Sequence, residues 1–181
     1  MRYLVACSEW IDRITAALGR GLRWIALALV ALGVINVVGR YLGAQIGVQL
    51  SSNALLEAQT QAFNLLFLLG AAWLMQRDAH IRVDILYAGF GRRVQLWIDI
   101  VGHTLLLVPF CCLMIALTWG HVVRAWQRLE VSPNPGGLPL YPIKTVLLIA
   151  FVLLLLQALS EIIKRIQSLR DDDGTADSEA R

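Results

Sequence analysis

The sequence predicts an all-α integral membrane protein with four transmembrane helices and an amphipathic interfacial helix before the first of them. Hydrophobic residues make up 57% of the 181-residue chain. Charged residues make up only 16%, whereas soluble domains carry about a quarter. The apolar residues gather into four blocks separated by polar, Gly-rich or Pro-rich stretches. This distribution indicates membrane spans rather than a soluble core.

Each apolar block is long enough to cross a bilayer, because roughly 20 helical residues at about 1.5 Å each span a hydrocarbon core of about 30 Å. The predicted spans cover residues 21–42, 53–75, 94–119 and 142–163. The third is longer than required, so it is expected to tilt, and Pro109 is expected to kink it. Residues 1–170 are therefore predicted to form one membrane domain, and the acidic residues 171–181 a disordered cytoplasmic tail.

A helical pattern precedes the first span. Cys7, Ile11, Ile14 and Leu18 recur at helical spacing, with charged residues on the other faces. This pattern predicts a short amphipathic helix that lies in the membrane surface and is retained in the mature protein.

Basic residues predict the orientation of the chain. Four spans put both termini on one side of the membrane, and 12 of the 16 lysines and arginines fall on that side. The positive-inside rule therefore places both termini in the cytoplasm. Aromatic rings favour the two membrane interfaces. They are expected at the inner interface as Trp24, Trp73 and Trp97, and at the outer one as Tyr41, Trp119 and Tyr141.

The second span carries three polar residues on one stripe. Glu57, Gln61 and Asn64 are spaced by four and then three residues, which places them on one helical face. One interpretation is an ion or substrate path. The others are a polar seam that grips another helix, or a carboxylate near the helix start, where the helix dipole favours it. A seam or a cap is favoured, because a single carboxylate without a basic partner makes a poor relay.

The third span carries Asp99 and His103, one turn apart. The two side chains could pair and relay protons, but a structural polar contact between helices is the favoured interpretation. At the end of the fourth span the polar pattern is typical of side chains that reach toward the membrane surface. These residues are Gln157, Ser160, Glu161, Lys164 and Arg165.

The sequence contains no recognisable catalytic motif. It contains no phosphate loop, CxxC motif or Ser-His-Asp spacing, and its three cysteines have no ligand-like spacing. His103 and His121 lie about 27 Å apart on one helix, so a bis-histidine haem would need His80 from a loop. We therefore expect neither an enzyme nor a bound cofactor.

The stretch QRDAHIRVD, residues 76–84, is by its position the cytoplasmic turn between the second and third spans. Arg77 and Arg82 are placed to meet lipid phosphates. Asp84 is a candidate N-cap for a short helix, and His80 could bridge the turn through hydrogen bonds. A metal site is disfavoured, because His80 and Asp84 have no further ligands nearby in sequence.

This stretch is part of a longer pattern. Residues 67–86, FLLGAAWLMQRDAHIRVDIL, join a span ending in Leu-Gly-Ala-Ala to a short basic stretch and a His-Ile-x-Val-Asp motif. In this pattern, and in the acidic position at Glu57, the chain resembles the DctQ-like small permease subunit of tripartite ATP-independent periplasmic (TRAP) transporters. Residues 130–144, EVSPNPGGLPLYPIK, resemble the alpha-keto acid and mannitol–chloroaromatic branch. Residues 58–61 lack the basic residue of many dicarboxylate members, which argues against a plain C4-dicarboxylate substrate.

The resemblance implies a non-catalytic scaffold in the bacterial inner membrane. In such transporters a separate large permease subunit contains the substrate and sodium sites, and a soluble periplasmic receptor delivers the solute. The small subunit would brace the large one and help dock the receptor for sodium-driven uptake of an organic acid. Its outer loop, residues 124–142, would either face the receptor or serve as an ordinary helix connection.

Two other functions are compatible with a small four-span protein. A membrane anchor for a haem- or quinone-dependent redox enzyme is one, although the placement of the histidines argues against it. A stand-alone channel or carrier is the other, but transporters normally have interrupted spans at a midplane site. The sequence shows no such interruption convincingly.

Overall fold

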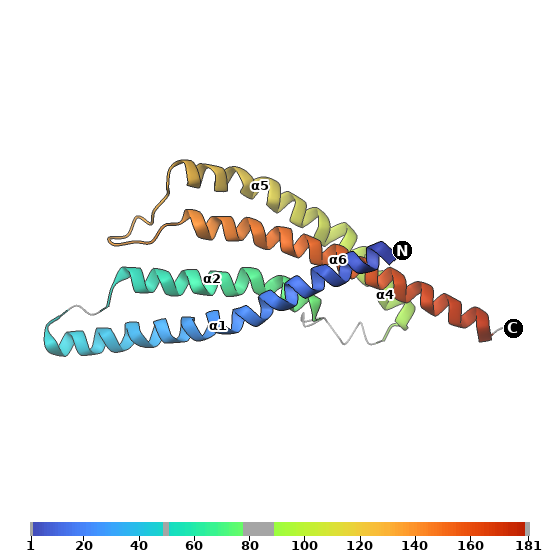
Figure 1. Ribbon diagram of the computed structural model, residues 1–181, viewed down its shortest axis with the longest axis horizontal. Coiled ribbons are helices and arrows are strands. Elements are labelled where there is room, and N and C mark those ends of the chain that lie inside the picture. The colour runs from blue at the N-terminus through green and yellow to red at the C-terminus, as the bar shows by residue number, and fades with distance from the viewer. Residues whose placement is uncertain (1, 49–50, 78–88, 180–181) are drawn as a thin grey trace.

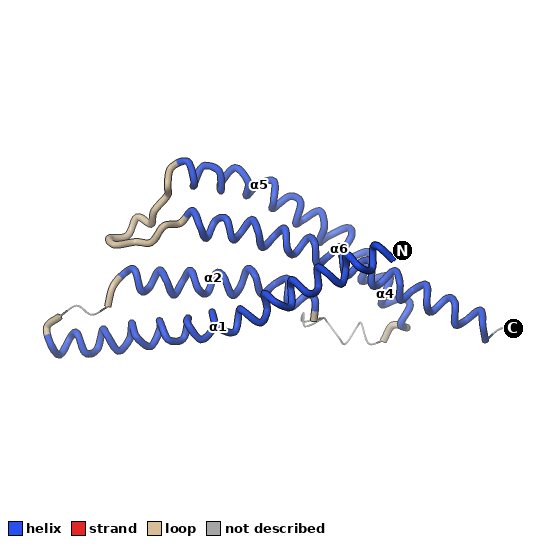
Figure 2. The backbone as a smooth tube through the Cα atoms, in the orientation of Figure 1, coloured by secondary structure: helices blue, strands red, loops and turns tan. Residues whose placement is uncertain are grey.

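The computed structural model is all-helical, as predicted (Figures 1 and 2). It describes residues 2–48, 51–77 and 89–179, and the side chains of residues 6–170 within those ranges. Its elements are α1 (Arg2–Ile46), α2 (Asn53–Gln76), α4 (Arg92–Gly102), the π-helical segment η1 (His103–Leu107), α5 (Val108–Gln127) and α6 (Tyr141–Glu179). Because α4, η1 and α5 follow one another without a break, the described residues form four long helical units. Helix α6 contacts each of the other three units, so it is the centre of the bundle.

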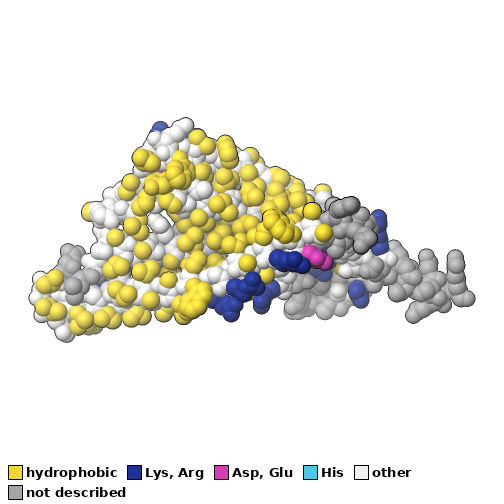
Figure 3. Space-filling view, in the orientation of Figure 1, with side chains coloured by type: hydrophobic (Ala, Val, Ile, Leu, Met, Phe, Trp, Pro, Cys, Tyr) yellow, Lys and Arg dark blue, Asp and Glu magenta, His cyan; other side chains and the backbone are white. Residues whose placement is uncertain are grey.

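Three of the four helical units are long and apolar enough to cross a membrane. They cover Ala6–Ile46, Arg92–Gln127 and Tyr141–Arg170. Helix α2 matches the predicted second span in its bounds but is not among these three. The reason is its polar content, which includes Glu57, Gln59, Gln61 and Asn64. Figure 3 shows hydrophobic side chains over most of the visible face, and basic side chains toward the end where the two termini lie.

The amphipathic helix predicted before the first span is not a separate element, because α1 is one helix of 45 residues. Its position in the membrane surface stays a prediction. No proline interrupts α1, and Figure 1 shows its N-terminal half bending toward and crossing α6. Ser8 and Thr15 are only 3% and 1% exposed. Ser8 and Thr15 of this segment are therefore buried against protein, whereas Glu9 and Arg13 on its other side stay exposed. Amphipathic periodicity alone does not distinguish these two environments.

Helices α1 and α2 pack antiparallel in a regular register. A Cβ atom added to Gly19 would lie 2.4 Å from the Trp73 ring, and one added to Gly33 would lie 3.4 Å from Gln59 Nε2. Between these points, Leu22 lies against Gly70. Positions 19, 22 and 33 fit a repeat of alternating three- and four-residue steps, the spacing of a left-handed helix pair. Small residues let the two backbones approach closely.

The close approach at Gly19 gives a testable expectation. Gly19→Ala should lower the free energy of unfolding in detergent by roughly 1–3 kcal/mol, because the new methyl group overlaps the Trp73 ring. Gly21, on the same turn, is the matched control, since nothing lies within 4 Å of an added Cβ there. Gly21→Ala should leave stability unchanged or raise it by up to about 1 kcal/mol. Equal effects in thermal unfolding followed by circular dichroism would contradict this packing.

The third helical unit changes its hydrogen-bonding pattern just before Pro109. The π-helical segment His103–Leu107 ends next to α5, and Pro109 lies in the first turn of that helix. Proline has no backbone N–H and its ring clashes with the carbonyl one turn earlier, so the preceding turn cannot keep the regular α-helical ladder. The kink predicted at Pro109 therefore corresponds to a wider, π-helical turn just before this residue.

Helix α6 continues past residue 170, the last residue of the predicted membrane domain. Its backbone is helical to Glu179, whereas the sequence predicts a disordered tail from residue 171. The segment 171–179 contains no proline, and its single glycine does not stop the helix. The division into a membrane domain and a separate tail stays a prediction.

Candidate functional site

The connection between α5 and α6 folds into a small hairpin, residues 129–140, which we call the outer hairpin. Val131 and Pro139 form an antiparallel bridge, Ser132 N–H donates to Leu138 O at 3.1 Å, and Leu140 N–H donates to Glu130 O at 2.8 Å. Gly136 has a φ of 72°, a left-handed conformation that glycine adopts without steric cost. The predicted outer loop is therefore folded on itself.

Glu57 of α2 holds the outer hairpin. Its Oε1 accepts hydrogen bonds from the Ser132 hydroxyl and, at 2.8 Å, from Asn134 Nδ2. Its Oε2 accepts the backbone N–H of Leu138 at 2.6 Å. One carboxylate thus joins three points of the hairpin, and hydrogen bonds to a charged acceptor are stronger than neutral ones.

Two further residues of α2 contact the same hairpin. Gln61 Nε2 donates to Pro139 O at 3.2 Å, and Asn53 Nδ2 donates to Pro135 O at 3.3 Å. Glu57 and Gln61, two members of the predicted stripe, therefore meet the hairpin together. The side chain of Asn64, the third member, makes no hydrogen bond to the described residues. The cap of α2 is Ser52, whose hydroxyl accepts Leu55 N–H at 3.3 Å, and not Glu57.

The base of the outer hairpin is fastened to α6, and side chains of α5 and α6 join these two helices directly beside it. Lys144 Nζ lies 2.5 Å from Glu130 Oε2, Trp126 Nε1 donates to Thr145 Oγ1 at 2.8 Å, and the rings of Trp126 and Tyr141 are 4.6 Å apart. The hairpin therefore has a fixed position on the bundle.

A second polar site lies between α1 and α6 near the chain termini. We call it the α1–α6 polar cluster; its members are Ser8, Asp12, Thr15, Gln157, Ser160, Glu161 and Lys164. Gln157 is fully buried at its centre. It accepts from Thr15 Oγ1 at 3.0 Å, and its Nε2 lies 2.9 Å from Asp12 Oδ1 and 3.3 Å from Glu161 Oε1.

The charged members of this cluster pair with one another. Lys164 Nζ lies 2.9 Å from Asp12 Oδ2 and 2.5 Å from Glu161 Oε1. Ser8 Oγ and Ser160 Oγ are 2.6 Å apart, and Gln76 of α2 donates to the backbone oxygen of Asp12 at 2.7 Å. Because each of these side chains has a partner, the cluster is a fastening of α1 to α6 rather than a pathway lined by free acids and bases.

Asp99 and His103 do not pair through their side chains. His103 Nδ1 lies 2.5 Å from the backbone oxygen of Asp99, within the same turn. The buried Asp99 carboxylate lies 3.4 Å from Arg165 NH1 of α6. The proton relay between these two residues is therefore not formed, and Asp99 makes a contact between helices.

The remaining predicted site residues, Arg77, His80 and Asp84, follow α2 in the sequence. The Arg77 guanidinium lies over the Trp73 ring, 4.6 Å from its centroid. His80 and Asp84 lie outside the described residues. Among the residues that the structure describes, no group of three or more His, Cys, Asp or Glu side chains is placed to hold a metal ion.

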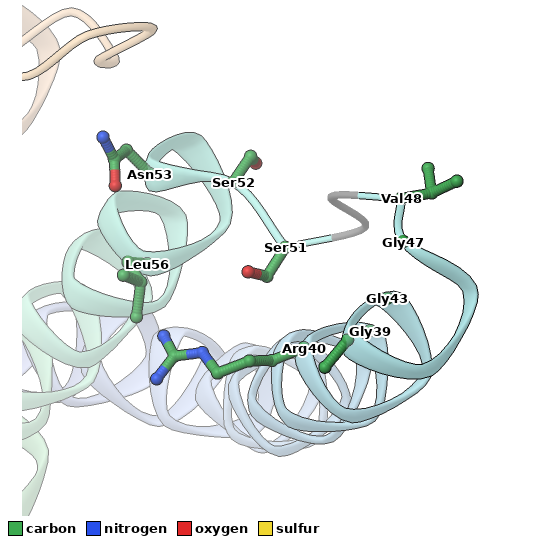
Figure 4. A pocket seen from close by; sticks show the side chains of 10 residues that line it. Gly39, Arg40, Gly43, Gly47, Val48, Ser51, Ser52, Asn53 and Leu56 are labelled. Carbon is green, nitrogen blue, oxygen red and sulfur yellow. The ribbon is translucent and has the colours of Figure 1, made fainter.

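At the opposite end of α1 a cavity of about 510 Å³ lies between the end of α1 and the start of α2. Figure 4 shows the Arg40 side chain extending from α1 toward Leu56, with Ser51 beside it. Arg40 is the one charged residue among those that line the cavity. An arginine without an acid or base beside it does not form a catalytic arrangement.

Sequence reasoning missed most of the α1–α6 polar cluster. It placed Gln157, Ser160 and Glu161 at the membrane surface, yet Gln157 and Ser160 are fully buried and Glu161 is 6% exposed. The signal that could have indicated burial is the matching set of small polar residues on the first helix, Ser8 and Thr15.

The fold and these contacts define a helical membrane protein whose polar side chains fasten its own elements together. Residues 29–168 match the family described as tripartite ATP-independent periplasmic transporters, DctQ component. Since the match covers more than half of the chain, the protein belongs to this family of transporter subunits, which is not enzymatic. No curated protein and no solved structure matches the chain.

Proposed function

We propose that this chain is the small permease subunit that braces the large permease subunit of a TRAP transporter and helps dock its periplasmic receptor. The observation that carries the proposal is the outer hairpin, which Glu57 and the Glu130–Lys144 pair hold rigidly at one end of the bundle. A rigid surface loses little conformational entropy when a partner binds it.

The proposal includes four spans in the inner membrane with both termini in the cytoplasm. Helix α2 has 24 residues, which corresponds to about 36 Å and is sufficient to cross the hydrocarbon core. Its polar residues Glu57 and Gln61 are compatible with a span because they bond to the outer hairpin, and α1 and α6 pack on two sides of the helix. In this arrangement the outer hairpin faces the periplasm and the α1–α6 polar cluster lies near the cytoplasmic surface.

The division of labour is the one that the family implies, in which sodium and the organic acid would bind to the large subunit. The described residues of this chain form no group of three or more His, Cys, Asp or Glu side chains placed to hold a metal ion. Arg124 and Arg128, near the outer hairpin, would contribute positive charge to the surface that the receptor approaches, whereas the charge of Lys144 is paired with Glu130. Such charge mainly increases the rate of association.

The proposal is tested by purifying the tagged chain from native membranes in mild detergent and identifying the proteins that come with it. We expect a large many-span membrane protein in near-equal amount, itself a component of the same transporter class. The purified chain alone should give no solute flux in liposomes, whereas the pair with receptor and a sodium gradient should. A chain that purifies alone, or with a coloured redox subunit, would contradict the proposal.

A further inference from the structure

Three exposed arginines surround a point where α1 and α2 are in close contact. Arg20 and Arg23 are on α1, and Arg77 follows the last turn of α2. We call these three residues the arginine cluster. None of them forms an ion pair with a residue that the structure describes. Figure 3 shows basic side chains over this part of α1, so the surface of the chain is positively charged here.

The packing of α1 on α2 brings Arg77 to this place. The Trp73 ring fills the space beside Gly19, where an added Cβ atom would lie only 2.4 Å from it. The Arg77 guanidinium lies over the same ring, 4.6 Å from its centroid. Arg23 is one turn after Gly19 on α1, so the cluster joins neighbouring turns of the two helices. A guanidinium over an aromatic face still presents its N–H groups to an oxyanion at the edge of its plane.

The acidic residues of α1 and α2 are engaged elsewhere. On α1 they are Glu9 and Asp12, both two or more turns before the cluster. Asp12 pairs with Lys164 of α6 at 2.9 Å, and Glu9 lies 4.0 Å from Arg13. On α2 the acidic residue is Glu57, which bonds to the outer hairpin at the opposite end of the helix. Neither helix therefore supplies a counter-ion for the arginine cluster.

The arginine cluster lies at one boundary of the apolar part of the bundle. Residues 24–39 of α1 and 58–76 of α2 contain no charged side chain. These stretches correspond to about 24 Å and 29 Å of helix, close to the hydrocarbon thickness of about 30 Å. Arg23 and Arg77 are the first charged residues beyond them, toward the end of the bundle where the termini lie. Trp24, which is 74% exposed, lies at the same boundary, and indole rings favour the membrane interface.

We propose that the arginine cluster binds the phosphate group of an anionic phospholipid in the leaflet on the side of the termini. At the level of the headgroups phosphate is the abundant anion, and a planar guanidinium binds its oxygens in bidentate fashion. Three cations favour a headgroup with a net negative charge over a zwitterionic one, whose ammonium group they repel. The inference goes beyond the proposed function, because it concerns the lipid around the chain and not a protein partner.

Competition between phospholipids tests this assignment. Fluorescently labelled phosphatidylglycerol is bound to the full-length chain in nonionic detergent, and its release is followed by fluorescence anisotropy. We expect unlabelled phosphatidylglycerol to displace the label at a concentration roughly tenfold or more below that of phosphatidylcholine with the same acyl chains. Equal displacement by the two lipids would overturn the proposal. Inorganic phosphate that competes as well as phosphatidylglycerol would show a site for free anions, and polyglutamate that competes better would show a site for an acidic protein. Either result would also overturn it.

A pair of double variants separates the cluster from net charge. Arg20→Gln combined with Arg23→Gln should weaken binding of the labelled lipid roughly tenfold or more. Arg124→Gln combined with Arg128→Gln removes the same charge at the other end of the bundle and should change binding little. All four side chains are exposed, so both double variants should unfold at the wild-type temperature. Equal losses of lipid binding would show that binding follows net charge, and the assignment would fail.

A pair of single variants tests the contribution of α2. Arg77→Gln should weaken binding of the labelled lipid roughly threefold or more, although this residue is remote from Arg20 and Arg23 in the sequence. Arg13→Gln is the matched control, because Arg13 is exposed on α1 but lies outside the cluster, and it should leave binding unchanged. Binding that depends on Arg13 and not on Arg77 would contradict a site formed between the two helices.

Discussion

Glu57→Ala is expected to release the outer hairpin while the helices stay folded. The carboxylate accepts bonds from Ser132, Asn134 and Leu138, and no other side chain of α2 contacts as many points of the hairpin. We expect amide hydrogen exchange across residues 130–140 to accelerate roughly tenfold or more, because local opening no longer breaks these bonds. Receptor-dependent uptake should fall with it, while the large subunit still co-purifies.

A graded series of variants separates this effect from general damage. Glu57→Gln keeps one carbonyl oxygen, so it can still accept from Ser132 and Asn134 but loses the bond from Leu138 N–H. Its exchange rates should fall between those of wild type and Glu57→Ala. Asn53→Ala removes one exposed bond of 3.3 Å to Pro135 and should change exchange little. If Glu57→Ala leaves the hairpin as protected as wild type, then the hairpin is held by its own turn and by the Glu130–Lys144 pair.

The helices could be predicted from the sequence because bilayer thickness imposes a minimum apolar length on each span. The starts of α2 and α6 lie within one residue of the predicted starts. The continuity of α1 was not predictable, since the pattern of Cys7, Ile11, Ile14 and Leu18 fits both a short separate helix and the first turns of a longer one. A local pattern contains no information about what a helix contacts.

A polar contact can be predicted from the sequence only when its two residues lie close together along the chain. The stripe of Glu57 and Gln61 was detectable from its spacing, but its partner is a hairpin more than 70 residues further along the chain. For Asp99 the spacing favoured a contact between helices over pairing with His103, but it did not identify Arg165 on α6 as the residue contacted. Pairing across helices depends on their relative rotation, and periodicity within one helix does not determine this rotation.

Gln157→Leu is expected to destabilise the bundle more than any exchange on its surface. Gln157 is fully buried and bonds to Thr15, Asp12 and Glu161. Leucine fills a similar volume but leaves these polar atoms facing a side chain that cannot bond to them. Leaving buried polar partners unsatisfied costs about 1–3 kcal/mol. We therefore expect the free energy of unfolding in detergent to fall by roughly 2–3 kcal/mol.

A double-mutant cycle tells whether this loss comes from the bond between α1 and α6. Thr15→Val removes the hydroxyl that donates to Gln157 at 3.0 Å, and the two exchanges together should cost less than the sum of the single ones. Leu159→Ala is the control, because Leu159 is 42% exposed on the same turn of α6 and should change stability little. Additive losses would show that Gln157 and Thr15 are not coupled, despite the bond between them. In that case the N-terminal half of α1 would have to be held on the bundle by other contacts, such as the 2.9 Å pair between Asp12 and Lys164.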